Sequence, residues 1–80
     1  MDLAKHFGAA VRHHRKAARI SQEELAARAG KDRTYVSGVE RGSRNPSLSV
    51  MQSIADALGV DLDILFSTAR QIAQSRAEKK

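Results

Sequence analysis

The chain has 80 residues, of which 41% are apolar and none is cysteine. This length allows one small domain with a modest core, and it excludes two catalytic domains that flank a cleft. Without cysteine, neither disulfides nor thiolate zinc sites can hold the fold together. Lysine and arginine outnumber aspartate and glutamate by 14 to 9, which gives a net charge of +5. This charge favours a polyanionic partner, although a charge kept for solubility has the same sign.

No apolar run approaches the ~18 residues that a membrane span needs. The first residues also lack the basic and apolar regions of a signal peptide. We therefore expect a cytoplasmic protein with no membrane partner. The aromatic residues are too few for the platforms on which single-stranded nucleic acids stack; they are Phe7, Tyr35 and Phe66. Duplex DNA is the better candidate, and a protein bound to it would be associated with the nucleoid.

Apolar residues recur every three or four positions and proline appears once, so the whole chain is predicted to be helical. The first helix is expected over Leu3–Ala18, with an apolar stripe that includes Leu3, Phe7, Ala10 and Val11. A capping box, Ser21-Gln22-Glu23-Glu24, starts a second helix, and Gly30 ends it. Asp32 caps a third helix, which Gly42 closes. Only a short turn separates these two helices, so they must cross steeply, as in a helix-turn-helix.

The second half of the chain predicts two more helices. Ser47 caps the fourth, and Gly59 stops it; its expected buried stripe is Leu48, Met51, Ile54, Ala55 and Leu58. Asp61 caps the fifth, which continues weakly beyond Phe66. The prediction is an all-α, five-helix bundle with a helix-turn-helix domain over residues 1–66. Residues 67–80 are then a helical extension or a frayed tail.

The third helix carries the candidate functional site. At 100° per residue, it turns Val36, Val39 and Glu40 to one side. The opposite side is small, polar or basic and consists of Arg33, Thr34, Ser37, Gly38 and Arg41. Side chains of this kind read base edges in a major groove, where arginine can bond O6 and N7 of guanine together. Arg33 and Thr34, at the front of the helix, would reach deepest. The alternative is an ordinary solvated helix face.

Two residues of this helix need an explanation. Gly38 costs about 1 kcal/mol relative to alanine inside a helix. Either a close approach of the backbone to a groove wall offsets this cost, or the glycine is a tolerated neutral choice. Glu40 lies on the inward side, where a lone carboxylate is costly, so it needs a cation. We interpret Glu40 as structural and not catalytic.

Histidines are the other residues with possible site chemistry: His6, His13 and His14. A zinc site would need a further ligand at helical spacing, so neither a metal nor another cofactor is predicted. Ser21 and Ser47 are explained as helix caps, and no Ser/His/Asp set shares an element. The protein is therefore not expected to be an enzyme.

At this point the chain resembles a known family. The residues that carry the resemblance are Ser21–Ala26, Gly30, Tyr35–Gly42, Asn45–Leu48 and Ile54–Val60. They are similar to the XRE family, the phage-repressor and Cro-type helix-turn-helix regulators of bacteria. Residues 32–38 and 44–45 are similar to the controllers of restriction-modification systems. The resemblance implies a lambda-repressor-like bundle whose third helix enters the major groove, and a homodimer that reads a palindromic or nearly palindromic operator.

The resemblance also implies roles for single residues. Gln22 would touch a phosphate or brace the recognition helix. Arg33, Thr34 and Ser37 would read bases, with Gly38 where many members have a longer side chain. Tyr35 would pack at the helix edge and reach a phosphate, and the loop residues Arg44 and Asn45 would grip the DNA backbone.

Two positions in and after the first helix are also assigned through the resemblance. Arg15 is the expected partner of Glu40. Arg19 stands where most members have glycine. It must then adopt a left-handed conformation at about 1–2 kcal/mol, or the first helix must end differently.

Residues 47–69 contain three aspartates and no lysine or arginine. Phosphate repels such a block, so it is the free surface for dimerisation. The expected interface consists of Val50, Leu62, Ile64, Thr68 and Ile72, and we expect Val50, Leu62 and Ile64 to be superfluous to the monomer core. The alternative function is a protein-binding adaptor or an antitoxin built on the same fold. For an adaptor we would expect an apolar or acidic face over residues 33–41, and the sequence has neither.

Overall fold

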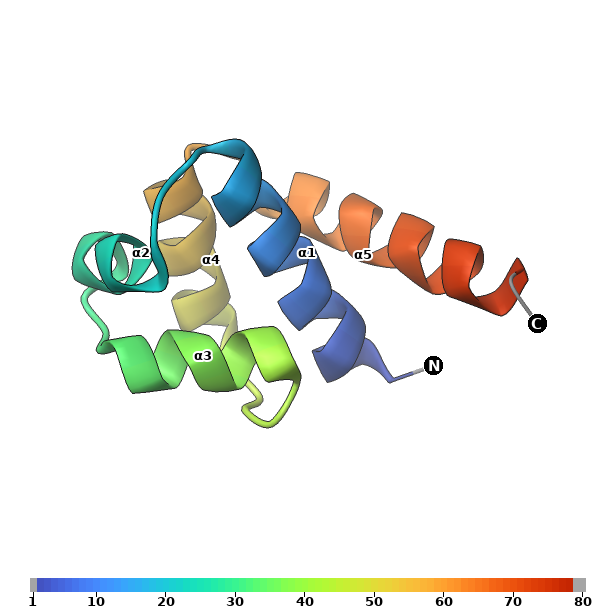
Figure 1. Cartoon of the computed structure of the whole chain (residues 1–80), viewed down its shortest axis with the longest axis horizontal. Coiled ribbons are helices and arrows are strands. Elements are labelled where there is room, and N and C mark those ends of the chain that lie inside the picture. Colours follow the sequence, from blue (N-terminus) through green and yellow to red (C-terminus); the bar gives the residue numbers. More distant parts are fainter. Residues whose placement is uncertain (1, 79–80) are drawn as a thin grey trace.

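In the computed structural model, which describes residues 2–78, five helices follow one another and no strand occurs in that range (Figure 1). The predicted all-α, five-helix bundle is therefore confirmed. The helices are α1 (Leu3–Ala17), α2 (Gln22–Ala29), α3 (Arg33–Arg41), α4 (Leu48–Leu58) and α5 (Leu62–Glu78).

The helix boundaries follow from the capping residues. The side chains of Ser21, Asp32 and Ser47 accept hydrogen bonds from backbone amides three residues later, at 3.0, 2.7 and 3.2 Å. Gly30 and Gly42 end α2 and α3 in the left-handed conformation that glycine adopts without strain. The reciprocal half of the predicted capping box is replaced by a different contact, because the Glu24 carboxylate accepts a hydrogen bond from Arg28 Nε at 3.0 Å.

Arg19 resolves the alternative left open at the end of the first helix. It has a φ of +60°, the left-handed conformation that the missing glycine would otherwise provide. The surrounding turn is held by hydrogen bonds from Arg19 N to Lys16 O at 3.0 Å and from Ile20 N to Arg15 O at 3.3 Å. The chain therefore accepts a local strain of about 1–2 kcal/mol at this position.

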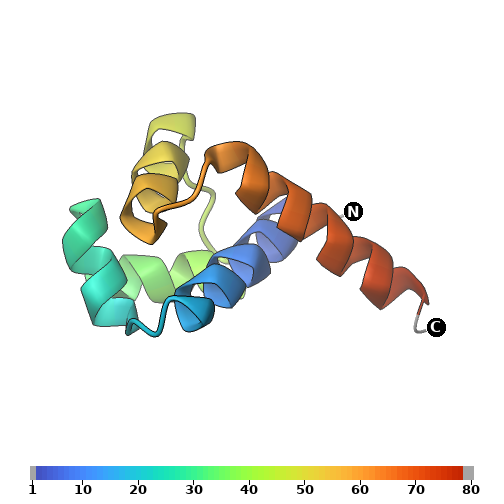
Figure 2. The ribbon, with the colours of Figure 1, turned by 90° about the horizontal axis from the view of Figure 1, so that it is seen from above.

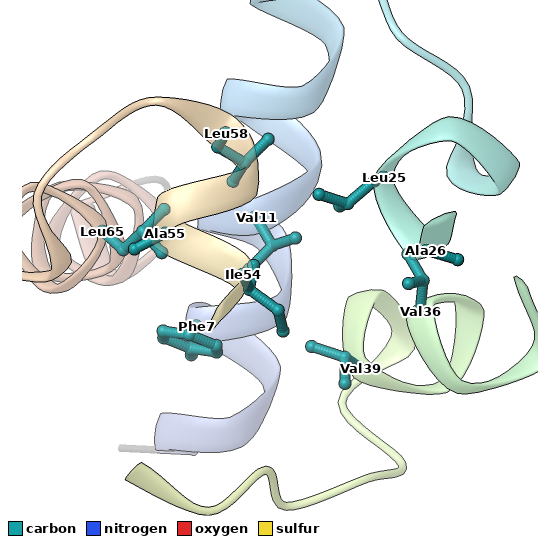
Figure 3. Packing of buried hydrophobic residues seen from close by; sticks show 10 residues of the cluster. All are labelled: Phe7, Val11, Leu25, Ala26, Val36, Val39, Ile54, Ala55, Leu58 and Leu65. Atoms are coloured by element: carbon teal, nitrogen blue, oxygen red, sulfur yellow. The ribbon is translucent and has the colours of Figure 1, made fainter. Parts of the chain in front are cut away.

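All five helices contribute to one core, shown in Figure 3. Its buried side chains are Phe7, Val11, Leu25, Ala26, Val36, Val39, Ile54, Ala55, Leu58 and Leu65. Two residues predicted for the apolar stripes lie at the surface: Leu3 is 56% exposed and Leu48 is 71% exposed. Each is the first residue of its helix and lies beyond the end of the buried stripe. Periodicity alone therefore assigned them wrongly.

α1 lies between α3 and α5 and packs against both (Figure 1). The expected boundary at residue 66 falls inside α5, and the packing continues past it, since Ala69 is buried. The last turns of α5 project beyond the bundle, as Figure 2 shows. The tail is thus helical as far as Glu78, and residues 79–80 lie outside the described range. None of the helices in residues 2–78 is long and apolar enough to cross a membrane.

Candidate functional site

α3 lies along one edge of the bundle (Figure 1). Arg33, Thr34 and Arg41 are exposed, whereas Val36 and Val39 are buried in the core. The predicted division of the helix into two faces is therefore confirmed at these positions. Its first turn, which carries Arg33 and Thr34, is open to a partner.

Gly38 departs from that prediction because it is buried. A Cβ built on it would stand 2.7 Å from Cγ of Arg44, whose side chain crosses this part of α3. The loop that brings Arg44 there is held by Ser43, whose backbone amide and Oγ donate to Gly38 O at 2.9 and 3.2 Å. The glycine therefore makes room for Arg44. The close approach of the backbone to a groove wall stays a prediction.

Tyr35 lies at the edge of α3, half-buried, beneath two cations. Arg44 Cζ lies 5.3 Å from the centroid of its ring, and Lys31 Nζ lies 5.2 Å from it. Such cation–π contacts contribute about 0.5–1 kcal/mol at exposed sites. Sequence reasoning named Tyr35 and Arg44 but missed Lys31. Its signal was a lysine in the short turn directly before α3.

A network centred on Glu40 fixes α3 against the rest of the bundle. Arg15 donates from Nε to Glu40 Oε2 at 2.7 Å and from Nη2 to Oε1 at 3.1 Å. Its Nη1 donates to the backbone oxygen of Ile20 at 3.0 Å. The hydrogen bonds to Glu40 raise the pKa of Arg15, outweighing the opposite effect of burial. The pair assigned through the family resemblance is present, with side chains 12% and 4% exposed for Arg15 and Glu40.

Gln22 completes the same network. Its Nε2 donates to Glu40 Oε1 at 3.1 Å, so its amide braces the recognition helix, one of the two roles expected for it. Arg41 Nη1 donates to Ser37 Oγ one turn earlier on α3, so these two side chains are linked on the outward face. Asn45 is exposed in the following loop, at the rim of an apolar groove that also includes Leu3 and Leu48.

The predicted dimer face contains one well-exposed apolar side chain, Ile64, which is 43% exposed. Val50 and Leu62 are half-buried and pack against the core, so the expectation that they are superfluous to it is wrong. Ile72 is half-buried on α5. Thr68 Oγ1 lies 2.8 Å from His14 Nε2 and is therefore bonded to α1. That these residues form an interface stays a prediction.

The histidines are half-buried or exposed. Burial lowers the pKa of His14, and the neighbouring His13 lowers it further. His6 Nδ1 is buried and has no hydrogen-bond partner among the described residues. Within residues 2–78, no three side chains of the types that bind metals come together.

α2 and α3 cross steeply (Figure 1), α3 is held in place through Glu40, and its first turn exposes Arg33. Together these features define a helix-turn-helix protein. A family model with the description Helix-turn-helix matches residues 11–65. The chain belongs to this family, of the XRE type, whose members are DNA-binding transcription regulators.

Three individual proteins illustrate the similarity. An HTH-type transcriptional regulator of Mycobacterium tuberculosis is 42% identical over 62 residues, which are 78% of this chain and 44% of the relative. The chain thus spans less than half of that relative. Control protein C.MunI of a Mycoplasma species is 42% identical over 67 residues, covering 82% of this chain and 90% of the relative.

Among solved structures, the restriction-modification controller protein C.AhdI from Aeromonas hydrophila has a TM-score of 0.75 and 48% identity. The alignment covers 80% of this chain and 96% of that one. The predicted resemblance to restriction-modification controllers is therefore confirmed.

Proposed function

We propose that the protein is a sequence-specific transcriptional regulator that binds duplex DNA through α3 and has no enzymatic activity. The observation that carries this proposal is the first turn of α3, where Arg33 and Thr34 are exposed on a helix held rigid by Glu40, Arg15 and Gln22. A rigid helix with an exposed arginine at its front can place a guanidinium on the edge of a guanine. Such a protein acts in the cytoplasm, at the nucleoid.

Lys31 and Arg44, both beside Tyr35, are the groups that would hold the phosphate backbone next to the reading helix. Ser37 lies one turn behind the front of α3, where its contact with Arg41 orients it on the outward side. Phosphate contacts of the kind proposed for Lys31 and Arg44 position a protein on DNA without selecting sequence. The proposal therefore divides the face into base readers at the front and backbone contacts around the following loop.

We further propose that the protein acts as a homodimer. A nine-residue reading helix makes too few contacts for specific binding by itself, and two half-sites about 34 Å apart require a two-fold axis. The acidic segment, residues 47–69, supports the choice of interface, because it is the part of the surface that DNA repels. The exposed Ile64 lies on it, and the other residues of the predicted interface, Val50, Leu62, Thr68 and Ile72, are half-buried.

Selection of bound sequences from a random duplex library tests the proposal. We expect enrichment of two related half-sites at a fixed spacing. Enrichment of no sequence over the starting library would contradict sequence-specific binding. A monomer in sedimentation at micromolar protein would contradict the dimer.

The alternative, an adaptor or antitoxin module, is less well supported. A protein-binding use of α3 calls for an apolar or acidic face, whereas its exposed side chains are polar or basic.

A further inference from the structure

A hollow of about 440 Å³ lies between α1, α3 and the end of α5. Four of its lining side chains are cationic and come from three helices: Lys5 and Arg12 from α1, Arg41 from α3, and Arg76 from α5. We call this set the basic hollow. Gln22, Ser37 and Glu40 complete its polar lining. The basic hollow therefore connects the outward side of α3 with α5. No residue of α5 is proposed to read bases.

Among the side chains of residues 2–77, none neutralises the charge of the basic hollow. The one carboxylate in its lining is Glu40, whose side chain is 4% exposed and already accepts bonds from Arg15 and Gln22. The ion pairs of the described residues are Arg15–Glu40 and Arg28–Glu24, so none involves the four cations. Like charges gathered in one concavity repel one another and attract an anion that can reach all of them.

The position of the basic hollow matches that of a phosphate strand. α3 has nine residues and is thus about 13 Å long, close to the ~12 Å width of the major groove. When Arg33 at the front of the helix enters the groove, Arg41 at the rear comes to the groove wall, where the phosphates lie. The hollow begins at Ser37 and Arg41 and extends from there to Lys5, Arg12 and Arg76.

We propose that the basic hollow binds the sugar-phosphate backbone of DNA beside the half-site, and that Arg76 makes α5 a DNA-contacting helix. This inference rests on the proposed function, because it assumes that α3 enters the major groove. The contact is independent of base sequence. It adds affinity and salt dependence without adding specificity.

The test compares Arg76→Ala with Arg70→Ala. Both residues are exposed arginines on α5, but Arg70 does not line the basic hollow, so the two variants lose the same charge at different places. Affinity for a mixed-sequence duplex is measured as a function of salt, which requires no knowledge of the operator. Arg76→Ala should lower the slope of log K against log salt by about 0.9, and Arg70→Ala should leave it unchanged. The double variant Arg12→Ala/Arg76→Ala should lower it by roughly twice that amount.

Several outcomes would overturn the inference. If Arg76→Ala and Arg70→Ala have equal slopes while the wild-type protein binds duplex DNA, the inference fails and the proposed function stands. If the wild-type protein binds no duplex, both fail. If Arg76→Ala changes the preferred bases in a library selection, Arg76 reads sequence and the backbone assignment is wrong. If Arg76→Ala sediments as a monomer where Arg70→Ala is dimeric, its role lies in assembly. Circular dichroism and the unfolding midpoint, expected to be unchanged, exclude a folding defect.

Discussion

Gly8 in α1 lies directly against the backbone of Val39 in α3. A Cβ at Gly8 would overlap the carbonyl oxygen of Val39 and stand 2.8 Å from that of Glu40. Both obstacles are backbone atoms, so α3 itself would have to shift. The position of the recognition helix therefore depends on a residue of α1 that has no side chain, and sequence reasoning did not single it out.

Gly8→Ala is expected to destabilise the fold even though alanine is the better helix former. Overpacking of this kind typically costs about 1–3 kcal/mol and sometimes more. The free energy of unfolding, measured in urea by circular dichroism, checks the prediction. The matched control is Gly38→Ala, because the atom in its way belongs to the Arg44 side chain, which can rotate aside.

Gly38→Ala should therefore destabilise the fold less than Gly8→Ala, because its obstacle is a side chain and alanine is the better helix former. Its duplex affinity should fall, since Arg44 is displaced from Tyr35. Equal unfolding energies for Gly8→Ala and the wild-type protein would show that α1 and α3 do not pack as described.

Removal of one partner of the Arg15–Glu40 pair should lower the free energy of unfolding strongly. Arg15→Met leaves a carboxylate that is almost fully buried, and removal of one partner from a buried pair costs about 3–5 kcal/mol. Gln22→Ala removes one of three hydrogen bonds to Glu40 and should cost about 1 kcal/mol. Chemical unfolding of both variants and of Arg15→Met/Glu40→Leu checks this. Recovery of most of the loss in the double variant is expected; no recovery would mean that Arg15 stabilises by packing alone.

Arg33 and Arg44 should affect DNA binding differently. Arg33→Ala should cost about 1–3 kcal/mol on the selected operator and relax the preference at one base pair, as expected for the loss of a guanidinium that reads a base edge. Arg44→Ala should weaken binding to every duplex and lower the salt slope by about one unit. Titrations of selected and mixed-sequence duplexes at several salt concentrations separate the two. Arg28→Ala is the control, because Arg28 forms an ion pair with Glu24 on α2. An equal loss on both duplexes for Arg33→Ala would refute a reading role.

His14 should make stability depend on pH. Burial and His13 lower its pKa in the folded protein below the ordinary value of 6.5. The unfolded chain then binds more protons at this site than the native chain when the pH is below that value. The contribution of neutral His14 is therefore complete above pH 6.5 and is lost as the pH falls from there toward the lowered pKa. Unfolding midpoints measured across this range should fall less for His14→Gln than for the wild-type protein. Equal slopes would exclude His14 as the cause.

Local chemistry made much of this structure predictable. Ser21, Asp32 and Ser47 cap helices because a short side-chain oxygen can reach an amide three residues later, and the following glycines end them without strain. The left-handed Arg19 was foreseen as one of two alternatives. Leu3 and Leu48 were assigned wrongly because the periodic pattern does not show where a helix leaves the core.

The sequence by itself determined the number and order of the helices, the ends of α2, α3 and α4, and the polar front of α3, since these depend on neighbours within one or two turns. Only the tertiary structure decided why Gly8 and Gly38 are glycine, that Lys31 and Arg44 share the ring of Tyr35, and that Arg76 joins Lys5 and Arg12. Contacts between residues far apart in the chain depend on how the helices cross. That crossing is set by the packing of the whole core, which no local pattern records.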